Sequence, residues 1–199
     1  ESRGLGDVYK RQAVEKIKSV NAKNIAFIGG GAMAEAIIKG ILGGGLVAAE
    51  HIHVGEHTQQ RCDYLKNIYG VDAVTDNNKA VENADLVIFA VKPQIAPKAL
   101  TADLIANFKQ DAWVLSIMGS VSLEQLHGYA PGFPVIRTMP NTPLAAGAGM
   151  TAICCDENIT EAMKNDAVAI FGSCGETEVV EESAIEAITA ISGCGPGYC

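Results

Sequence analysis

A glycine-rich turn at residues 29–34 constrains the fold more than any other feature of this sequence. Residues 24–28 form a short apolar run that predicts a buried strand, and the apolar spacing of residues 32–42 predicts a helix. The turn between them has the pattern G-x-G-x-x-A and consists of Gly29, Gly30, Gly31, Ala32, Met33 and Ala34. Gly29 permits the tight turn, Gly31 lets the backbone approach a pyrophosphate, and Ala34 allows close helix–strand packing. The turn therefore predicts a dinucleotide-binding unit; the alternative is a glycine-rich turn that binds nothing.

Strands and helices continue to alternate after this turn. The run at residues 85–91 is continuously apolar, which indicates a strand buried on both faces of a parallel sheet. Further strands are predicted at residues 51–54, 71–74, 113–117, 133–138, 149–155 and 176–180, and helices at 59–69, 77–82, 95–108, 159–171 and from 183 onward. This order predicts a Rossmann-type, doubly wound, mostly parallel α/β sheet.

Composition and charge exclude several classes of protein. The net charge of −8 argues against binding to nucleic acid, whose phosphates it would repel. The six cysteines include no C-x-x-C pair, so we expect neither structural zinc nor a disulfide framework, and no other metal site is expected. No apolar run approaches the roughly 20 residues that span a bilayer. We therefore expect a cytoplasmic protein that binds no membrane.

The end of the second strand bears on the choice of nucleotide. Glu56 suits a ribose 2′-OH, which favours NAD. His57 and Thr58, with Arg61 one helical turn later, suit a 2′-phosphate instead. These residues alone leave NAD and NADP open.

Three more loops follow strands and so face the same ligand-binding edge of the sheet. The first holds Ala90, Val91, Lys92 and Pro93, the second Met118, Gly119 and Ser120, and the third the run from Arg137 to Pro143. Pro93 also suits the first turn of a helix. Two prolines and Asn141 stiffen the third loop, which alternatively is only a rigid polar connection.

Together these motifs resemble the pyrroline-5-carboxylate reductase family. The matching stretches are residues 27–36, 90–94, 137–143 (Arg-Thr-Met-Pro-Asn-Thr-Pro) and 191–196 (Ile-Ser-Gly-Cys-Gly-Pro). The resemblance implies NAD(P)H-dependent reduction of 1-pyrroline-5-carboxylate to L-proline, by hydride transfer to the imine carbon. We expect NADP(H) as the cofactor rather than NAD(H). Other NADP-linked reductases of the hydroxyacid dehydrogenase and deazaflavin-dependent superfamily, and a non-catalytic dinucleotide-binding module, are the alternatives.

The resemblance also implies an organisation of the chain. Residues 1–22 are expected to be a disordered or artefactual arm, residues 23–181 the Rossmann domain, and residues 182–199 the start of an all-helical domain. The full-length protein is expected to be a homodimer or a decamer of dimers. The chain ends at Cys199, before the family's later helices.

Site residues follow from the resemblance as well. The turn at residues 29–34 holds the pyrophosphate, Asn77 lies near the adenosine, and residues 90–93 and 118–120 flank the nicotinamide. The substrate carboxylate is expected at Ser192, Gly193, Gly195 and Pro196. No catalytic acid is evident. The chain departs from the family at Met118–Ser120, where alanine and glycine types are usual, and at Gly197, where alanine is usual.

Overall fold

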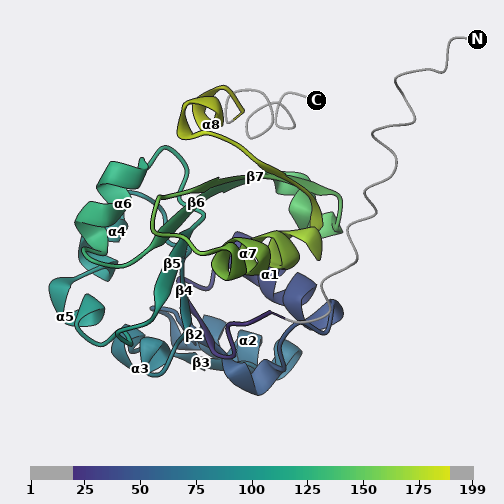
Figure 1. Ribbon diagram of the computed structural model, residues 1–199. Helices are drawn as coiled ribbons and strands as arrows, with labels where there is room; N and C mark the ends of the chain where they lie inside the picture. The colour runs from purple at the N-terminus through teal and green to yellow at the C-terminus, as the bar shows by residue number, and fades with distance from the viewer. Residues whose placement is uncertain (1–19, 189–199) are drawn as a thin grey trace, which may run out of the picture.

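A single eight-stranded sheet organises the protein. The computed structural model describes residues 20–188, and its strands lie in the order β3-β2-β1-β4-β5-β6-β7-β8 (Figure 1). Neighbouring strands are parallel except for the antiparallel pair β6–β7. The doubly wound, mostly parallel fold class is therefore confirmed. The strands are β1 (Ile25–Ile28), β2 (Ile52–Gly55), β3 (Asp72–Val74), β4 (Leu86–Phe89), β5 (Trp113–Ser116), β6 (Val135–Pro140), β7 (Gly149–Cys155) and β8 (Gly175–Val179).

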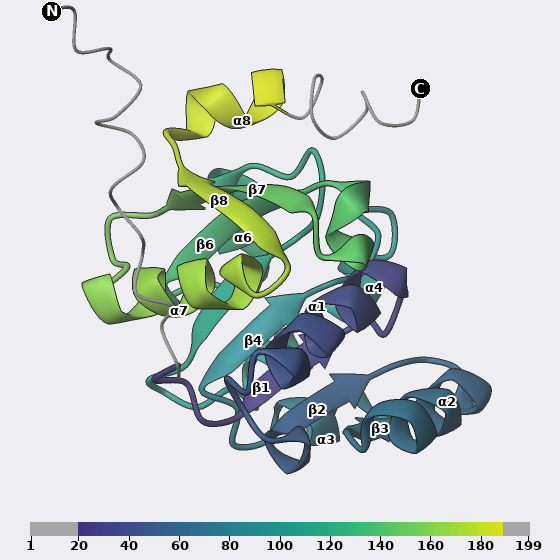
Figure 2. The same cartoon turned by 90° about the vertical axis from the view of Figure 1, so that its right-hand side faces the viewer.

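Helices cover both faces of the sheet (Figures 1 and 2). One face packs against α1 (Ala32–Gly43), α2 (Gln59–Tyr69), α7 (Glu161–Gly172) and two 3₁₀ turns, η1 (Ala49–His51) and η2 (Thr142–Ala146). The other packs against α3 (Asn77–Val81), α4 (Ala96–Ala99), α5 (Ala102–Ile105) and α6 (Leu123–Tyr129). The last described helix, α8 (Glu182–Ile188), lies against β7.

The central strands contribute to both layers of the core, as their continuous apolar runs predict. In β1, Ile25 and Phe27 join the layer under α1, whereas Ala26 and Ile28 join the layer under α5. All four are fully buried. Successive side chains of a strand point to opposite faces, so a strand between two helical layers needs apolar residues at every position.

The antiparallel pairing of β6 with β7 follows from the short connection between these two strands. Parallel neighbours need a crossover of about a dozen residues or more, usually containing a helix. Residues 141–148 provide only η2 between β6 and β7, so the chain turns back along the same sheet. This reversal brings the start of β7 to the carboxyl end of β6.

The single helix predicted at residues 95–108 is wrong. The segment forms two short helices, α4 and α5. Leu100 leaves the helical conformation, and the Thr101 hydroxyl accepts a hydrogen bond from the Leu104 amide, 3.3 Å away, as the N-cap of α5. An N-cap residue that satisfies its own first turn starts a new helix rather than extending the old one.

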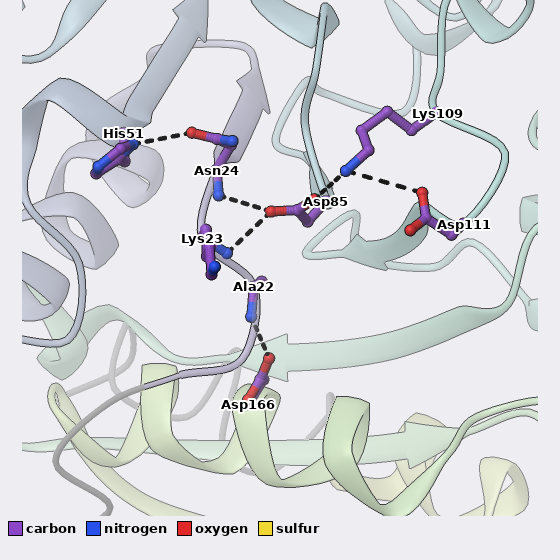
Figure 3. Close-up of polar contacts among 8 residues, drawn as sticks. All are labelled: Ala22, Lys23, Asn24, His51, Asp85, Lys109, Asp111 and Asp166. Atoms are coloured by element: carbon purple, nitrogen blue, oxygen red, sulfur yellow. Dashed lines mark hydrogen bonds and ion pairs between the residues drawn. The ribbon is translucent and has the colours of Figure 1, made fainter.

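Two carboxylates hold the segment that enters β1 (Figure 3). Asp166 of α7 accepts hydrogen bonds from the Asn21 and Ala22 amides at 2.8 and 2.9 Å. Asp85, just before β4, accepts from the Lys23 and Asn24 amides, each at 2.9 Å. Asp85 also pairs with Lys109. Four consecutive backbone amides are thus satisfied by two side chains, which fixes β1 against both α7 and β4.

Candidate functional site

The β1–α1 turn is packed closely at its first two glycines and open at the third. Gly29 has a φ of +103°, and a Cβ there would lie 2.8 Å from the Ala90 carbonyl oxygen. A Cβ at Gly30 would lie 2.9 Å from Leu65, whereas a Cβ at Gly31 would have no atom within 4 Å. The backbone at Gly31 and Ala32 is exposed at the carboxyl edge of the sheet. This is the open approach that a diphosphate requires.

Helix α1 begins without a side-chain cap. Its N-cap is Gly31, in an extended conformation, and no side chain accepts a hydrogen bond from its first turn. Side chains do cap α3, α5, α6 and α7, through Asp76, Thr101, Ser122 and Thr160. The amides at the start of α1 are therefore available to an anion, which the helix dipole favours.

Glu56, at the end of β2, is bound to the turn. One carboxylate oxygen accepts a hydrogen bond from the Gly30 amide at 3.1 Å. The other accepts from the amide and hydroxyl of Thr58, each at 3.2 Å, and pairs with His57 at 2.7 Å. Glu56 is 9% exposed, while the His57 side chain is 88% exposed. Both Glu56 oxygens are thus engaged within the protein.

Arg61 of α2 joins this turn to α1. Its Nε donates to the Gly30 carbonyl oxygen at 2.7 Å, and a terminal nitrogen pairs with Glu35 at 2.5 Å. Glu35 also accepts hydrogen bonds from Tyr69 at 2.7 Å and Tyr64 at 3.0 Å. Sequence reasoning missed Glu35 and Tyr69, because no local pattern relates two helices far apart in the chain.

These contacts shift the pKa values of Glu35 and Tyr69. Burial alone would raise the pKa of Glu35, but hydrogen bonds from Tyr69, Arg61 and Tyr64 more than offset it and hold the pKa below its usual value. The hydrogen bond to the Glu35 carboxylate raises the pKa of Tyr69 to about 12. At neutral pH Glu35 is therefore ionised and Tyr69 is neutral.

Asn77, the predicted adenosine-side residue, packs against the end of β2. A Cβ at Gly55 would lie 2.3 Å from the Asn77 side-chain oxygen, so the glycine makes room for this amide. Asn77 is half-buried at the first position of α3. It lies at the same edge of the sheet as Glu56, which follows Gly55 directly.

The two loops predicted to flank the nicotinamide approach each other. Pro93 and Ser120 line one cavity of about 370 Å³, with Gln125 and Tyr129 of α6. Ala90 donates its amide to the Ile28 carbonyl oxygen at 2.9 Å, beside the glycine turn. Lys92 is exposed and Val91 half-buried.

The residues of the 118–120 loop differ in what they present to this edge. The Met118 side chain is 2% exposed and belongs to the core under α6, so only its backbone can line the site. Gly119 lies beside Met139, and Ser120 is exposed with a φ of +59°. This left-handed conformation is uncommon for a residue with a Cβ.

The polar loop after β6 is joined to the neighbouring strand by a side-chain hydrogen bond. The Asn141 side-chain oxygen accepts a hydrogen bond from the Met150 amide at 2.9 Å, across to β7. Thr138 donates its hydroxyl hydrogen to the Ser116 carbonyl oxygen at 2.8 Å. The carboxyl ends of β5 and β6 and the start of β7 are thus held together at the same edge of the sheet.

The remaining expectations concern the substrate-binding residues, metal sites and membrane spans. The described residues do not include the predicted substrate-binding residues Ser192, Gly193, Gly195 and Pro196. They also leave out most of the expected N-terminal arm. Residues 20–188 contain no group of three or more side chains suited to a metal ion. In the same part of the chain, no helix has both the length and the apolar character to cross a membrane.

Known proteins with similar sequences are pyrroline-5-carboxylate reductases. The chain is 38% identical over 174 residues to the pyrroline-5-carboxylate reductase of Synechocystis sp., which covers 87% of this chain and 64% of that protein. It therefore spans less than two thirds of the length of this relative. The sequence model of the family described as "NADP oxidoreductase coenzyme F420-dependent" matches residues 24–120.

Solved structures give the same result. The pyrroline-5-carboxylate reductase of Coxiella burnetii superposes with a TM-score of 0.83 at 32% identity, covering 89% of this chain and 66% of that chain. The Plasmodium falciparum pyrroline carboxylate reductase, solved with NADP bound, gives 0.78 at 28% identity, covering 89% and 64%. By its sequence relatives and by its fold, the chain belongs to the pyrroline-5-carboxylate reductase family.

Proposed function

We propose that the protein reduces 1-pyrroline-5-carboxylate to L-proline with a nicotinamide dinucleotide as hydride donor. The observation that carries the proposal is the unobstructed backbone at Gly31, at the uncapped start of α1. In a chain whose relatives are pyrroline-5-carboxylate reductases, this opening is where a cofactor diphosphate fits.

The cofactor fits the residues present at this edge. The amides of the α1 first turn hold the diphosphate, and Asn77 and His57 line the adenosine end. Residues 90–93 and 118–120 line the nicotinamide end. When bound, the nicotinamide supplies the hydride.

We further propose that NADP(H) is preferred to NAD(H). Both Glu56 oxygens already accept hydrogen bonds within the protein, from the Gly30 amide and from Thr58, so a ribose 2′-OH would compete with these contacts for the carboxylate. His57, whose side chain is 88% exposed and pairs with Glu56 through Nδ1, can present its other ring nitrogen to a 2′-phosphate, and the positive charge of Arg61 lies nearby. The Plasmodium falciparum relative was solved with NADP bound.

The chain's own residues position the reactants and keep the site rigid. Thr138 binds the carboxyl end of β5, and Asn141 joins the loop after β6 to the start of β7, which holds the 118–120 loop in place. Orientation of this kind supplies much of the rate enhancement in a hydride transfer. We assign no side chain as proton donor and propose that solvent protonates the imine. Ser192 to Pro196 are proposed to bind the substrate carboxylate, and residues 182–199 to begin a helical domain through which two copies associate.

A direct assay tests the proposal. The intact protein should oxidise NADPH when 1-pyrroline-5-carboxylate is added and should form proline in equal amount. Turnover of a hydroxyacid or of a deazaflavin in place of the cyclic imine would contradict it. Tight NADPH binding without any turnover would instead support a non-catalytic dinucleotide-binding module.

A further inference from the structure

Both polar groups of the Gly30 backbone are held by side chains from outside the glycine turn. Its N–H donates to a Glu56 carboxylate oxygen at 3.1 Å, and its carbonyl oxygen accepts a hydrogen bond from the Arg61 Nε at 2.7 Å. Glu56 follows β2, and Arg61 lies in the first turn of α2. The segment that leads from β2 into α2 therefore holds the residue directly before Gly31, where the diphosphate is proposed to bind.

Arg61 is itself fixed by its surroundings. Its terminal nitrogen pairs with Glu35 at 2.5 Å, and its guanidinium carbon lies 4.9 Å from the centre of the Tyr64 ring. Glu35 accepts further hydrogen bonds from Tyr64 at 3.0 Å and Tyr69 at 2.7 Å. The side chains of Arg61 and Glu35 are only 26% and 21% exposed. A planar guanidinium with several fixed partners has little freedom to leave the Gly30 carbonyl.

The glycine turn needs such a contact, because packing does not fix all of it. A Cβ at Gly31 would meet no atom within 4 Å, and three successive glycines allow a wide range of backbone conformations. The Gly30 carbonyl and the Gly31 N–H belong to one planar peptide unit. A donor that holds this carbonyl therefore also fixes the plane of the peptide that leads into α1.

We propose that Arg61 is a positioning residue that keeps the glycine turn in its diphosphate-binding conformation, and that Glu35 acts by holding Arg61. The diphosphate is common to NADH and NADPH. Arg61 therefore supports the binding of both nucleotides, whereas a residue that only contacts the 2′-phosphate acts on NADPH alone. The inference rests on the proposed function, because it takes the turn as the place of a cofactor diphosphate.

Nucleotide titration of the intact protein tests this role, and NADH gives the cleaner result because it has no 2′-phosphate. Arg61→Met keeps an apolar stem without the donors and should raise the Kd for NADH about five- to tenfold, and that for NADPH at least as much. A turn that spends about a tenth of its time in the binding conformation binds about tenfold more weakly. Lys66→Met removes an exposed cation from the same helix, so it is the matched control and should stay within about twofold of wild type.

A conservative variant separates geometry from charge. Arg61→Lys keeps the positive charge but loses the planar fork that reaches Gly30 and Glu35 together, so it should recover little of the affinity for NADH. Full recovery in Arg61→Lys would overturn the inference, because charge alone would then be sufficient. An unchanged Kd for NADH in Arg61→Met would overturn it as well, whether or not NADPH binding is weakened.

A double-variant cycle tests whether Glu35 acts through Arg61. Glu35→Ala should also raise the Kd for NADH. Adding it to Arg61→Met should cause little further loss, because the contact that Glu35 supports is already gone. A general loss of stability would not produce this pattern, since it would not link the two effects on affinity. Fully additive losses would contradict the proposed role of Glu35.

Amide hydrogen exchange provides a readout that needs neither nucleotide nor turnover. The Gly30 amide and the Glu35 amide, which donates to the Gly31 carbonyl oxygen at 2.9 Å, should exchange faster in Arg61→Met than in Lys66→Met. The amides of β5, near the middle of the sheet, should not change, which separates opening of the turn from global unfolding. Unchanged exchange at Gly30 and Glu35 would overturn the inference. If the wild-type protein binds both nucleotides but does not reduce 1-pyrroline-5-carboxylate, the proposed function fails, and these experiments still decide the role of Arg61.

Discussion

Gly29 and Gly31 meet different physical requirements within one turn. Gly29 is needed by the fold, since its φ of +103° and its contact with the Ala90 carbonyl leave no room for a side chain. Gly31 has neither constraint. Its lack of a side chain is unnecessary for folding, so a ligand is the simplest explanation for it. This difference makes Gly31 the position at which binding can be perturbed without disturbing the structure.

Gly31→Val should therefore weaken NADPH binding by more than about tenfold while leaving the melting temperature nearly unchanged, because the branched side chain occupies the space of the diphosphate. Fluorescence titration and thermal unfolding measure the two effects. Gly43→Val is the matched control, since a Cβ at the other end of α1 also meets nothing within 4 Å. Unchanged NADPH affinity in Gly31→Val would contradict the proposed cofactor site.

His57 provides the residue-scale test of cofactor preference. If it contacts a 2′-phosphate, His57→Ala should lower the affinity for NADPH about three- to tenfold and leave the affinity for NADH unchanged. His51→Ala is the control, because His51 is an exposed histidine just before β2 and hydrogen-bonds Asn24 at 2.9 Å. Equal losses for both nucleotides would show that His57 does not distinguish them.

At the scale of elements, the sequence predicted what depends on local pattern. The glycine turn, the parallel central strands and the end of α2 at Gly70, with its φ of +71°, were all readable from apolar periodicity and glycine placement. The break between α4 and α5 was missed, although Thr101 followed by Leu104 carries an N-cap signal. Helix α6 was given no range from the sequence, despite the Ser122 and Gln125 capping box.

Contacts between distant segments could not be predicted in this way. Asp166 binding Asn21 and Glu182 binding Arg137 join residues far apart in sequence, and neither pair has a local signature. Glu56 shows the consequence for the site. Its position after a strand suggested a ribose acceptor, whereas its side chain reaches back to the Gly30 amide. Only the tertiary arrangement decides which partner a carboxylate takes.

Asp166 joins α7 to the segment before β1, and its substitution should lower the free energy of unfolding. In Asp166→Asn one oxygen becomes an amide donor facing the donors of Asn21 and Ala22, so the variant should lose about 1.5–3 kcal/mol of unfolding free energy. Urea unfolding measures this loss. Glu161→Gln, at an exposed site on the same helix, should stay within about 0.5 kcal/mol of wild type. Equal stabilities would show that the contact with Asp166 contributes nothing.

At the scale of the whole molecule, one sheet is shared by two helical layers. Trp113, the single tryptophan of the sequence, lies on β5 near the middle of the sheet and is 4% exposed. Its fluorescence therefore reports on unfolding of the common core rather than of one helix. Glu35 joins α1 to α2, and Asp85 joins β4 to the segment before β1, so both carboxylates connect separate parts of this core.

These two carboxylates predict how global stability depends on pH. The pKa of Asp85, like that of Glu35, is lowered: burial alone would raise it, but Lys109 and the Asn24 and Lys23 amides outweigh that effect. Carboxyls with lowered pKa values in the folded state bind fewer protons there than in the unfolded state. Their contribution to stability is therefore complete above the ordinary values of 4.5 for Glu35 and 3.8 for Asp85, and is lost as pH falls through the lowered values.

The urea midpoint followed by Trp113 fluorescence should accordingly change little near neutral pH and fall steeply below about pH 4.5. The double variant Glu35→Gln with Asp85→Asn should be less stable at pH 7, and its stability should depend less on pH in the acid range, because its amides do not titrate. Asp103→Asn with Glu124→Gln removes the same two charges from exposed positions and should keep the wild-type pH dependence. If both double variants lose stability in acid as steeply as wild type, other groups must control acid unfolding. In that case the carboxylates that join α1 to α2 and β4 to the segment before β1 would only direct the fold and would not determine its stability in acid.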